Sequence, residues 1–205
     1  FNGRQWPVSC NQVLFYNGGN SGVQEGQATL TGYMLFKRFN RSVSLTNPGV
    51  ASQFRPSIIF RLADFYLMYA EAANEVNPND VRVLKYLNLV RERAGLPGVE
   101  TLNPAIRGNQ ELQRAAIQRE RQVELATEGQ RYFDVRRWMI ADKNGEGRQN
   151  GYAHGMNVRG EPNDIDDFNR VVEASQIVFN RKMYLYPMPD SEMRKTKNLV
   201  QNPGW

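Results

Sequence analysis

The strongest constraint on the fold is a short break between two helical patterns in the middle of the chain. After Pro56, apolar residues recur at steps of three and four, which predicts one apolar helix face: Ile58, Leu62, Phe65, Tyr69 and Ala73. A second apolar face follows at Val83, Leu87, Val90 and Ala94. The break predicts a new helix start with Asn77 as N-cap, Pro78 at the first position and Asp80 at the third, and Gly95 predicts its end. Two helices joined so closely predict an antiparallel hairpin of the tetratricopeptide type.

A third helix is predicted from Gln110 to Glu128, and acidic residues interrupt its apolar face. The apolar positions are Leu112, Ala116 and Val123, with Glu120 between them on the helical wheel. Glu120, Glu124 and Glu128 share one face, and partly buried carboxylates need cations. We therefore predict a structural ion-pair network that draws on Arg137 and on Arg61, Glu120, Glu124, Glu128, Arg131, Asp134 and Arg136.

The rest of the chain predicts loops with few strands. Residues 1–56 form a loop-rich segment with one strand at Thr29–Lys37, and residues 57–141 form the helical core. A short helix over Tyr132–Ile140 would end this core and pack Phe133 and Trp138. We therefore expect one mainly α domain with minor β-strands.

The C-terminal third, residues 142–205, predicts a long loop before the last elements. Lys143–Asp167 is polar, glycine-rich and without periodicity, which is typical of a functional or mobile loop. Lys182–Tyr186 reads as a strand, and Ser191–Lys195 as a short helix capped by Asp190. The last four residues, Asn202-Pro203-Gly204-Trp205, predict a tight turn that delivers the terminal aromatic side chain.

Composition excludes several kinds of site. A single cysteine, Cys10, excludes an intramolecular disulfide framework and a cysteine-rich zinc site. A single histidine, His154, excludes a metal centre built on several histidines and disfavours Ser–His catalysis. There is no run of about 18 apolar residues that would span a membrane as a helix.

The positive charge is mixed with acidic residues. The chain carries 26 Lys and Arg against 21 Asp and Glu, a net charge of +5. Its densest basic stretch, Arg114–Arg137, also holds four acidic residues, whereas a nucleic-acid-binding surface needs segregated cations. Twenty of the 26 cations are arginine, the residue best suited to bidentate pairing with carboxylates. The charge therefore indicates ion pairs, and we expect no nucleic-acid partner.

Three ordered motifs carry a resemblance to a known family. The first is Phe60–Ala72 with Val90–Pro97, the second is Arg119–Trp138, and the third is Leu185–Pro189 with Gln201–Trp205. Together they resemble the C-terminal part of the SusD/RagB family of outer-membrane nutrient-binding lipoproteins in Bacteroidota.

The resemblance spans the chain from about Gly32 to Trp205 and implies a binding role. It implies a protein on the outer-membrane surface that captures oligosaccharide, or peptide in some members, for a SusC-like TonB-dependent transporter. Family members are more than twice this length, so the lipid anchor would lie upstream of this chain and would be its only link to the membrane. The family is not known for catalysis. Its motif residues, Trp138 and Trp205 among them, are expected to be scaffold.

Aromatic and planar polar residues in loops are the candidates for ligand binding. A pyranose ring stacks on Trp or Tyr, and its hydroxyl groups pair with amide, imidazole and guanidinium groups. Two loops hold such residues, with Gln5, Asn11, Asn20, Asn157 and Arg159 as neighbours. The sequence therefore predicts ligand contacts at Arg4, Trp6, Tyr16, Asn17, Tyr152 and His154.

Three alternatives stay open. Asp164, Asp166 and Asp167 resemble a weak calcium cluster, although an EF-hand's glycine and distal glutamate are absent, and we expect no other cofactor. Glu120 and Glu124 could serve a carbohydrate-active enzyme, although both project from one helix face and lie among arginines. The helical hairpin could instead be a protein-interaction module that binds no nutrient.

Overall fold

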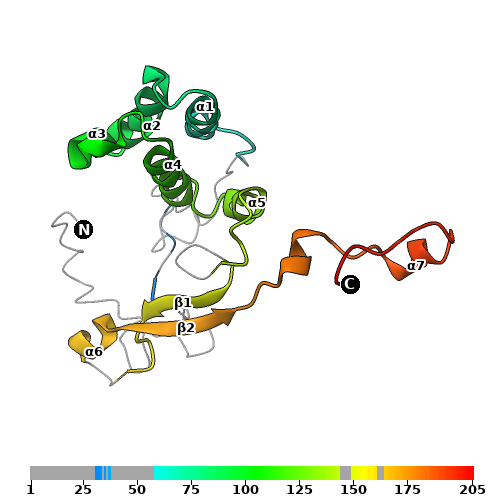
Figure 1. The fold of residues 1–205 in the computed structure, drawn as a ribbon. Coiled ribbons are helices and arrows are strands. Elements are labelled where there is room, and N and C mark those ends of the chain that lie inside the picture. The colour runs from blue at the N-terminus through cyan, green and yellow to red at the C-terminus, as the bar shows by residue number, and fades with distance from the viewer. Residues whose placement is uncertain (1–30, 34, 36, 38–57, 144–148, 161–163) are drawn as a thin grey trace, which may run out of the picture. The chain divides into compact units, whose positions relative to one another are not determined.

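The computed structural model describes residues 31–33, 35, 37, 58–143, 149–160 and 164–205. The chain divides into two compact units, Phe54–Trp138 and Phe1–Gln53 with Met139–Trp205. In the first unit the elements are α1 (Leu62–Val76), α2 (Val81–Arg93), α3 (Val99–Leu102), the 3-10 helix η3 (Pro104–Ile106), α4 (Gln110–Glu124) and α5 (Gln130–Arg137). In the second they are β1 (Gly151–Met156), α6 (Ile165–Asn169), β2 (Val171–Ile177), the 3-10 helix η4 (Arg181–Tyr184) and α7 (Asp190–Met193). The expected mainly α fold with minor β-structure is confirmed, and Figure 1 shows these elements.

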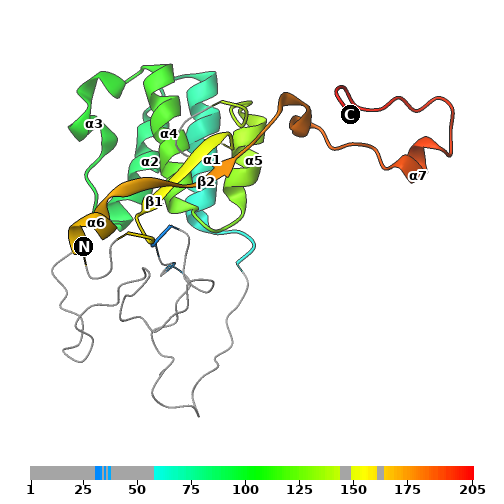
Figure 2. The ribbon, with the colours of Figure 1, turned by 90° about the horizontal axis from the view of Figure 1, so that it is seen from below.

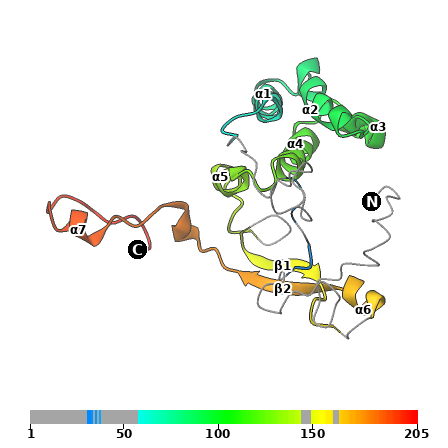
Figure 3. The same ribbon diagram turned by 180° about the vertical axis from the view of Figure 1, so that it is seen from behind.

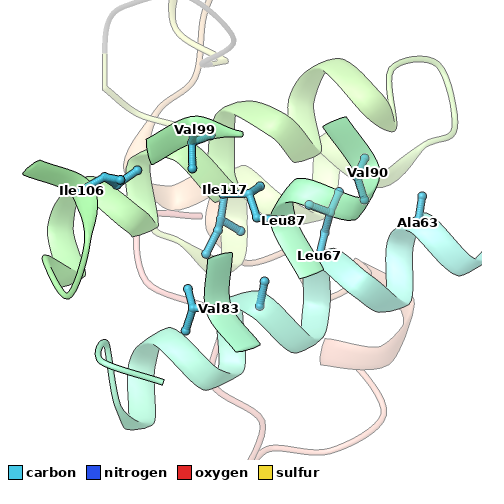
Figure 4. Close-up of a cluster of buried hydrophobic side chains, with 9 residues drawn as sticks. Ala63, Leu67, Val83, Leu87, Val90, Val99, Ile106 and Ile117 are labelled. Atoms are coloured by element: carbon cyan, nitrogen blue, oxygen red, sulfur yellow. The ribbon is translucent and has the colours of Figure 1, made fainter. Parts of the chain in front are cut away.

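The core of the helical unit lies where α1, α2 and α4 pack together. Figure 2 shows α1, α2 and α4 side by side. Leu67 of α1, Leu87 of α2 and Ile117 of α4 have no exposed surface. Figure 4 shows that side chains from these helices converge on one cluster, to which Val99 of α3 and Ile106 of η3 also belong. Burying apolar side chains in this way stabilises the unit by about 1.5–3 kcal/mol for each large residue.

The predicted helical hairpin forms, but the N-cap of its second helix lies three residues further on than predicted. Asn77 ends α1, and Asp80 is the N-cap of α2 because its carboxylate accepts a hydrogen bond from the backbone N–H of Arg82 at 2.9 Å. At the other end Gly95 takes a left-handed conformation with a φ of 76°. Its N–H donates to Glu92 at 2.9 Å and that of Leu96 donates to Arg91 at 2.9 Å, the pattern of a Schellman motif. The glycine end of the helix is therefore confirmed.

The cap of α2 makes the hairpin sensitive to acid. Hydrogen bonds from the Arg82 guanidinium and backbone lower the pKa of Asp80 from 3.8 to about 2. Since the pKa is lower in the folded chain, this contribution to stability is present above pH 3.8 and is lost as the pH falls towards 2. We expect Asp80→Asn, which keeps a capping oxygen, to flatten the fall in melting temperature between pH 4 and pH 2. Thermal unfolding across this range tests it, and an unchanged acid limb would contradict it.

The buried face of α1 is not the one that its largest apolar residues predict. The buried residues are Ala63, Asp64, Leu67, Ala70 and Asn74. The predicted face is instead open, with exposed fractions of 63% at Leu62, 52% at Phe65 and 40% at Tyr69, and Ile58 before the helix is 68% exposed. The helix is apolar on two sides, and its small alanines allow α2 and α4 to approach on one of them. We call Leu62, Phe65, Tyr69 and Val76 the open stripe of α1.

The third predicted helix ends four residues earlier than Glu128, the predicted short helix at Tyr132–Ile140 forms as α5, and the inner face of α4 is polar. It ends at Glu124, and the chain turns through Thr127 and Gly129, both with positive φ, before α5 begins. The buried residues of α4 are Gln113, Ile117, Glu120 and Arg121, whereas the predicted Leu112 and Val123 are 36% and 65% exposed. Phe133 on α5 is also exposed, so its predicted packing is wrong. These polar residues turn inward because each one has a hydrogen-bond or ion-pair partner inside the helical unit.

The second unit contains a β-hairpin that the sequence reading missed. Strand β1 lies within the predicted loop Lys143–Asp167 and β2 just after it, and the two pair antiparallel (Figure 3). Their register is irregular between Ala153 and His154. The strand predicted at Lys182–Tyr186 is wrong, because Arg181–Tyr184 forms a 3-10 turn with Asn180 accepting from the Met183 N–H at 2.8 Å. The five described residues of the predicted strand Thr29–Lys37 lie outside any strand.

The C-terminal turn forms as predicted, but its tryptophan is not a core residue. Asn202 accepts a hydrogen bond from the Trp205 N–H at 3.2 Å, with Gly204 at a φ of 88°. Trp205 is 44% exposed. Its indole N–H donates to the carbonyl oxygens of Lys182 and Leu185 at 3.1 and 3.0 Å, and the Lys182 ammonium lies 4.3 Å from the ring centre. The Trp205 side chain therefore holds the 3-10 turn in place.

Among the described residues, no helix has the length and apolar character to cross a membrane.

Candidate functional site

A buried arginine joins three helices of the helical unit. Arg121 of α4 donates to Asp64 of α1 at 3.0 Å and to Asp134 of α5 at 2.9 and 3.2 Å. The three side chains are only 3–6% exposed. Charges this deep are tolerated only when they are paired, so Arg121 fixes α1, α4 and α5 to one another. Sequence reasoning treated Arg121 only as a neighbouring charge. No local signal would have found it, because its burial depends on Asp64 and Asp134, which lie 57 and 13 residues away in the chain.

A second set of pairs lies at the end of α4. Arg61 pairs with Glu124 and, at 2.7 Å, with Glu128, and it also donates to the Glu124 carbonyl at 2.6 Å. Arg93 donates to Glu124 at 2.7 Å. Burial lowers the pKa of Arg61, but its hydrogen bonds to Glu128 and Glu124 outweigh that effect and raise it overall. Charge-assisted hydrogen bonds therefore join the start of α1 to the end of α4.

The remaining predicted members of the network have other surroundings. Glu120 pairs with Arg91 at 2.8 Å, an arginine that the prediction did not include. The Arg136 guanidinium lies 3.4 Å from the Tyr132 ring centre, and that of Arg131 lies 5.7 Å from the ring of Trp138. These two arginines stack on aromatic rings of α5 and its end.

Glu71 of α1 completes the contact with the end of α5. It accepts from both terminal nitrogens of Arg137, at 2.5 and 2.6 Å, and from the indole N–H of Trp138 at 2.6 Å. Trp138 is half-buried, as a scaffold residue should be. Like Glu124, Glu71 and Glu120 accept charge-assisted hydrogen bonds from arginine. Chemically, this arrangement suits a rigid scaffold far better than a general acid.

The β1–β2 hairpin carries the predicted ligand residues that the structure describes. Tyr152 and His154 lie two residues apart on β1 and share one face, both exposed, Tyr152 by 49%. Across the ladder Tyr152 pairs with Gln176 and His154 with Glu173, and these two side chains are exposed as well. We call these four residues the hairpin face. Sequence reasoning missed Glu173 and Gln176 because it did not predict either strand.

The neighbouring turn holds its polar residues in structural contacts. Asn157 is buried and donates to Asp167 at 3.0 Å, and Asp167 also pairs with Arg170 at 3.0 Å. Asp164 caps α6 by accepting from the N–H groups of Asp166 and Asp167 at 2.9 and 3.0 Å. Within the described ranges, no group of three His, Cys, Asp or Glu side chains is placed to hold a metal ion. Calcium binding at this turn stays a prediction.

The predicted ligand residues of the first loop, Arg4, Trp6, Tyr16 and Asn17, lie outside the described residues, as do Gln5, Asn11 and Asn20. Arg159, on the turn after β1, is described and exposed.

Comparison with known proteins places this scaffold in a family. The model of the SusD family matches residues 1–205. SusD-like protein P2 of Formosa agariphila is 31% identical over 151 residues, which cover 72% of this chain and 26% of that protein. SusD-like protein P25 of the same organism is 45% identical over 83 residues, 40% of this chain and 15% of that protein.

Solved structures agree in fold. The structure of BT4246 matches with a TM-score of 0.63 and 33% identity over 76% of this chain and 26% of its own. A SusD-like protein from Bacteroides fragilis matches with a TM-score of 0.58 and 32% identity over 73% of this chain and 26% of its own. The chain thus spans about a quarter of the length of these relatives. Because the family model matches residues 1–205 of this chain, the chain belongs to the SusD family.

Proposed function

We propose that this protein is a nutrient-binding surface lipoprotein that captures oligosaccharide and passes it to a SusC-like TonB-dependent transporter in the outer membrane. The observation that carries the proposal is the match of the SusD family model to the whole chain. The lipid anchor would lie upstream of residue 1, and the membrane would be contacted only through it. The chain to which this proposal applies spans about a quarter of the length of SusD-like protein P2.

The division of labour within the chain supports a binding role without catalysis. The Arg121 cluster and the pairs at Glu120 and Glu124 hold the helices together, and each carboxylate is engaged by an arginine. A glycosidase places two carboxyl groups on either side of the scissile bond, whereas Glu120 and Glu124 both lie on α4 and are both paired with arginine. We therefore expect that a bound saccharide is not turned over. The helical unit would serve as a structural scaffold.

Isothermal titration of the full chain against neutral oligosaccharides, acidic oligosaccharides and short peptides tests the proposal. We expect saturable heat with at least one saccharide. Saturable heat with peptides alone would replace the oligosaccharide with a peptide nutrient. Absence of binding heat with all three ligand classes would contradict nutrient binding by this chain. It would favour a protein-interaction module, and the exposed apolar residues of the open stripe of α1 support that alternative.

A further inference from the structure

We infer that the hairpin face, Tyr152 with His154, Glu173 and Gln176, is a contact surface for a neutral pyranose chain. This inference rests on the proposed function, since it names where and what class of saccharide the chain binds. It extends the sequence prediction by adding two residues of β2, Glu173 and Gln176, and it leaves out the neighbouring Asn157, which is buried and donates to Asp167.

Strand pairing gathers the four side chains into one surface. Residues directly opposite in an antiparallel pair point to the same face, with their Cβ atoms about 5 Å apart. The pairs Tyr152–Gln176 and His154–Glu173 therefore lie on one face. Between them the ladder is irregular, because β2 holds one extra residue, Ala174, and this extra residue lets Glu173 and Gln176 share a face although they are three residues apart. Such bulges re-aim side chains next to binding sites.

On the opposite face of the hairpin, Thr31 approaches the backbone of β1 closely at Gly155. At Gly155 an added Cβ atom would lie 2.6 Å from the Thr31 Cα atom and 2.8 Å from its carbonyl oxygen. The Met156 N–H donates to the same Thr31 carbonyl at 2.9 Å. This close approach of the Thr31 backbone accounts for the glycine at position 155, whereas all four side chains of the hairpin face are exposed.

The chemistry of the hairpin face suits a sugar. A tyrosine ring offers an apolar plane for the C–H groups of a pyranose, and its hydroxyl group stays available to water or to the ligand. Gln176 supplies two donors and an acceptor, Glu173 supplies acceptors, and His154 supplies one of each when neutral. Planar amide, carboxylate and imidazole groups beside one aromatic ring match the vicinal hydroxyl groups of a pyranose.

The charge of the hairpin face selects against acidic glycans. Strands β1 and β2 contain no lysine or arginine, and Glu173 adds a negative charge. The nearest cation in sequence, Arg170, is paired with Asp167 at 3.0 Å. A uronate or sulfate group would meet a carboxylate here with no cation from the strands to compensate it, and like charges in contact oppose binding. The ligand class is therefore a neutral oligosaccharide.

Single substitutions on the two strands test the inference in the full chain. Tyr152→Ala is expected to weaken binding of neutral oligosaccharide about tenfold, and Gln176→Ala by a smaller factor. Tyr152→Phe keeps the ring and should restore affinity to near the original value. Ser175→Ala, the neighbour of Gln176 whose partner Ala153 lies on the opposite face, is the matched control and should have no effect. Circular dichroism verifies that each variant is folded.

The outcomes separate this inference from the proposed function. Neutral oligosaccharide bound equally by the original chain, Tyr152→Ala and Gln176→Ala would overturn the hairpin face and leave the proposed function standing. Binding of acidic oligosaccharides alone would overturn the neutral ligand class. Absence of saccharide binding in the original chain would overturn both.

Discussion

Replacing Arg121 with methionine is expected to lower the free energy of unfolding by about 3–5 kcal/mol, because it removes the cation that pairs with buried carboxylates. Asp64 and Asp134 are 6% and 4% exposed, and both lie at hydrogen-bond distance from this guanidinium. Asp134 keeps a second cation, Arg137, at 2.9 Å. Methionine fills a similar volume, so the loss comes from the uncompensated charges and not from a cavity.

Arg114 on the same helix provides the matched control. It pairs with Glu75 of α1 at 2.6 Å, but the two side chains are 38% and 44% exposed. Exposed pairs contribute about 0.2–1 kcal/mol, so Arg114→Met should cost no more than about 1 kcal/mol. Urea unfolding of both variants, followed by circular dichroism, gives the comparison. Equal losses in the two variants would mean that the Arg121 cluster does not hold the helices together.

Replacing Glu124 with alanine is expected to cost about 2–3 kcal/mol, less than the loss at Arg121. Glu124 is 10% exposed and receives hydrogen bonds from Arg61 and Arg93. Arg61 is 22% exposed and keeps Glu128, while Arg93 is 63% exposed, so water can partly rehydrate the cations left behind. This solvent access is why the expected loss is smaller.

The control for Glu124 is an exposed glutamate on a neighbouring helix. Glu92→Ala on α2 changes the same residue type at an exposed position and should change stability by less than about 0.5 kcal/mol. Unfolding at low and high salt adds a second readout. Salt screens exposed charges more than buried ones, so the difference between the two variants should persist at high salt. A Glu124→Ala loss that matches the Glu92→Ala loss would contradict the ion-pair interpretation.

The helical scaffold could be predicted from the sequence because its signals are local. The spacing of apolar residues predicted two helices, and Gly95 predicted the end of the second. The N-cap was misplaced because Asn77 also fits the capping pattern. The structure favours Asp80, whose carboxylate is bound at once by the backbone and side chain of Arg82. Local rules thus locate a break but choose poorly between two capping residues in it.

The buried faces could not be predicted because distant residues decide them. α1 is apolar on two sides, and only its contacts with α2 and α4 determine that the side with Ala63, Leu67 and Ala70 is buried. On α4, Arg121 is buried because Asp64 and Asp134 come from elements 57 and 13 residues away. An amphipathic pattern ranks Arg121 as a surface residue.

The hairpin face was only half visible in the sequence. Tyr152 and His154 stood out as an aromatic and an imidazole in a polar segment. Strand β1 is rich in glycine and alanine and lacks the β-branched residues that identify strands. Without β1 there was no partner for Val171–Ile177, so Glu173 and Gln176 could not be placed beside Tyr152.

The central claim, that this chain binds a saccharide and that its hairpin face makes the contact, is tested most directly by nuclear magnetic resonance. Amide resonances of the full chain are followed while a neutral oligosaccharide is added. We predict saturable shifts centred on Tyr152, His154, Glu173 and Gln176, with the amides of Arg121 and its partners unchanged. Saturable shifts confined to the helical unit, or no shifts at saturating ligand, would contradict the claim.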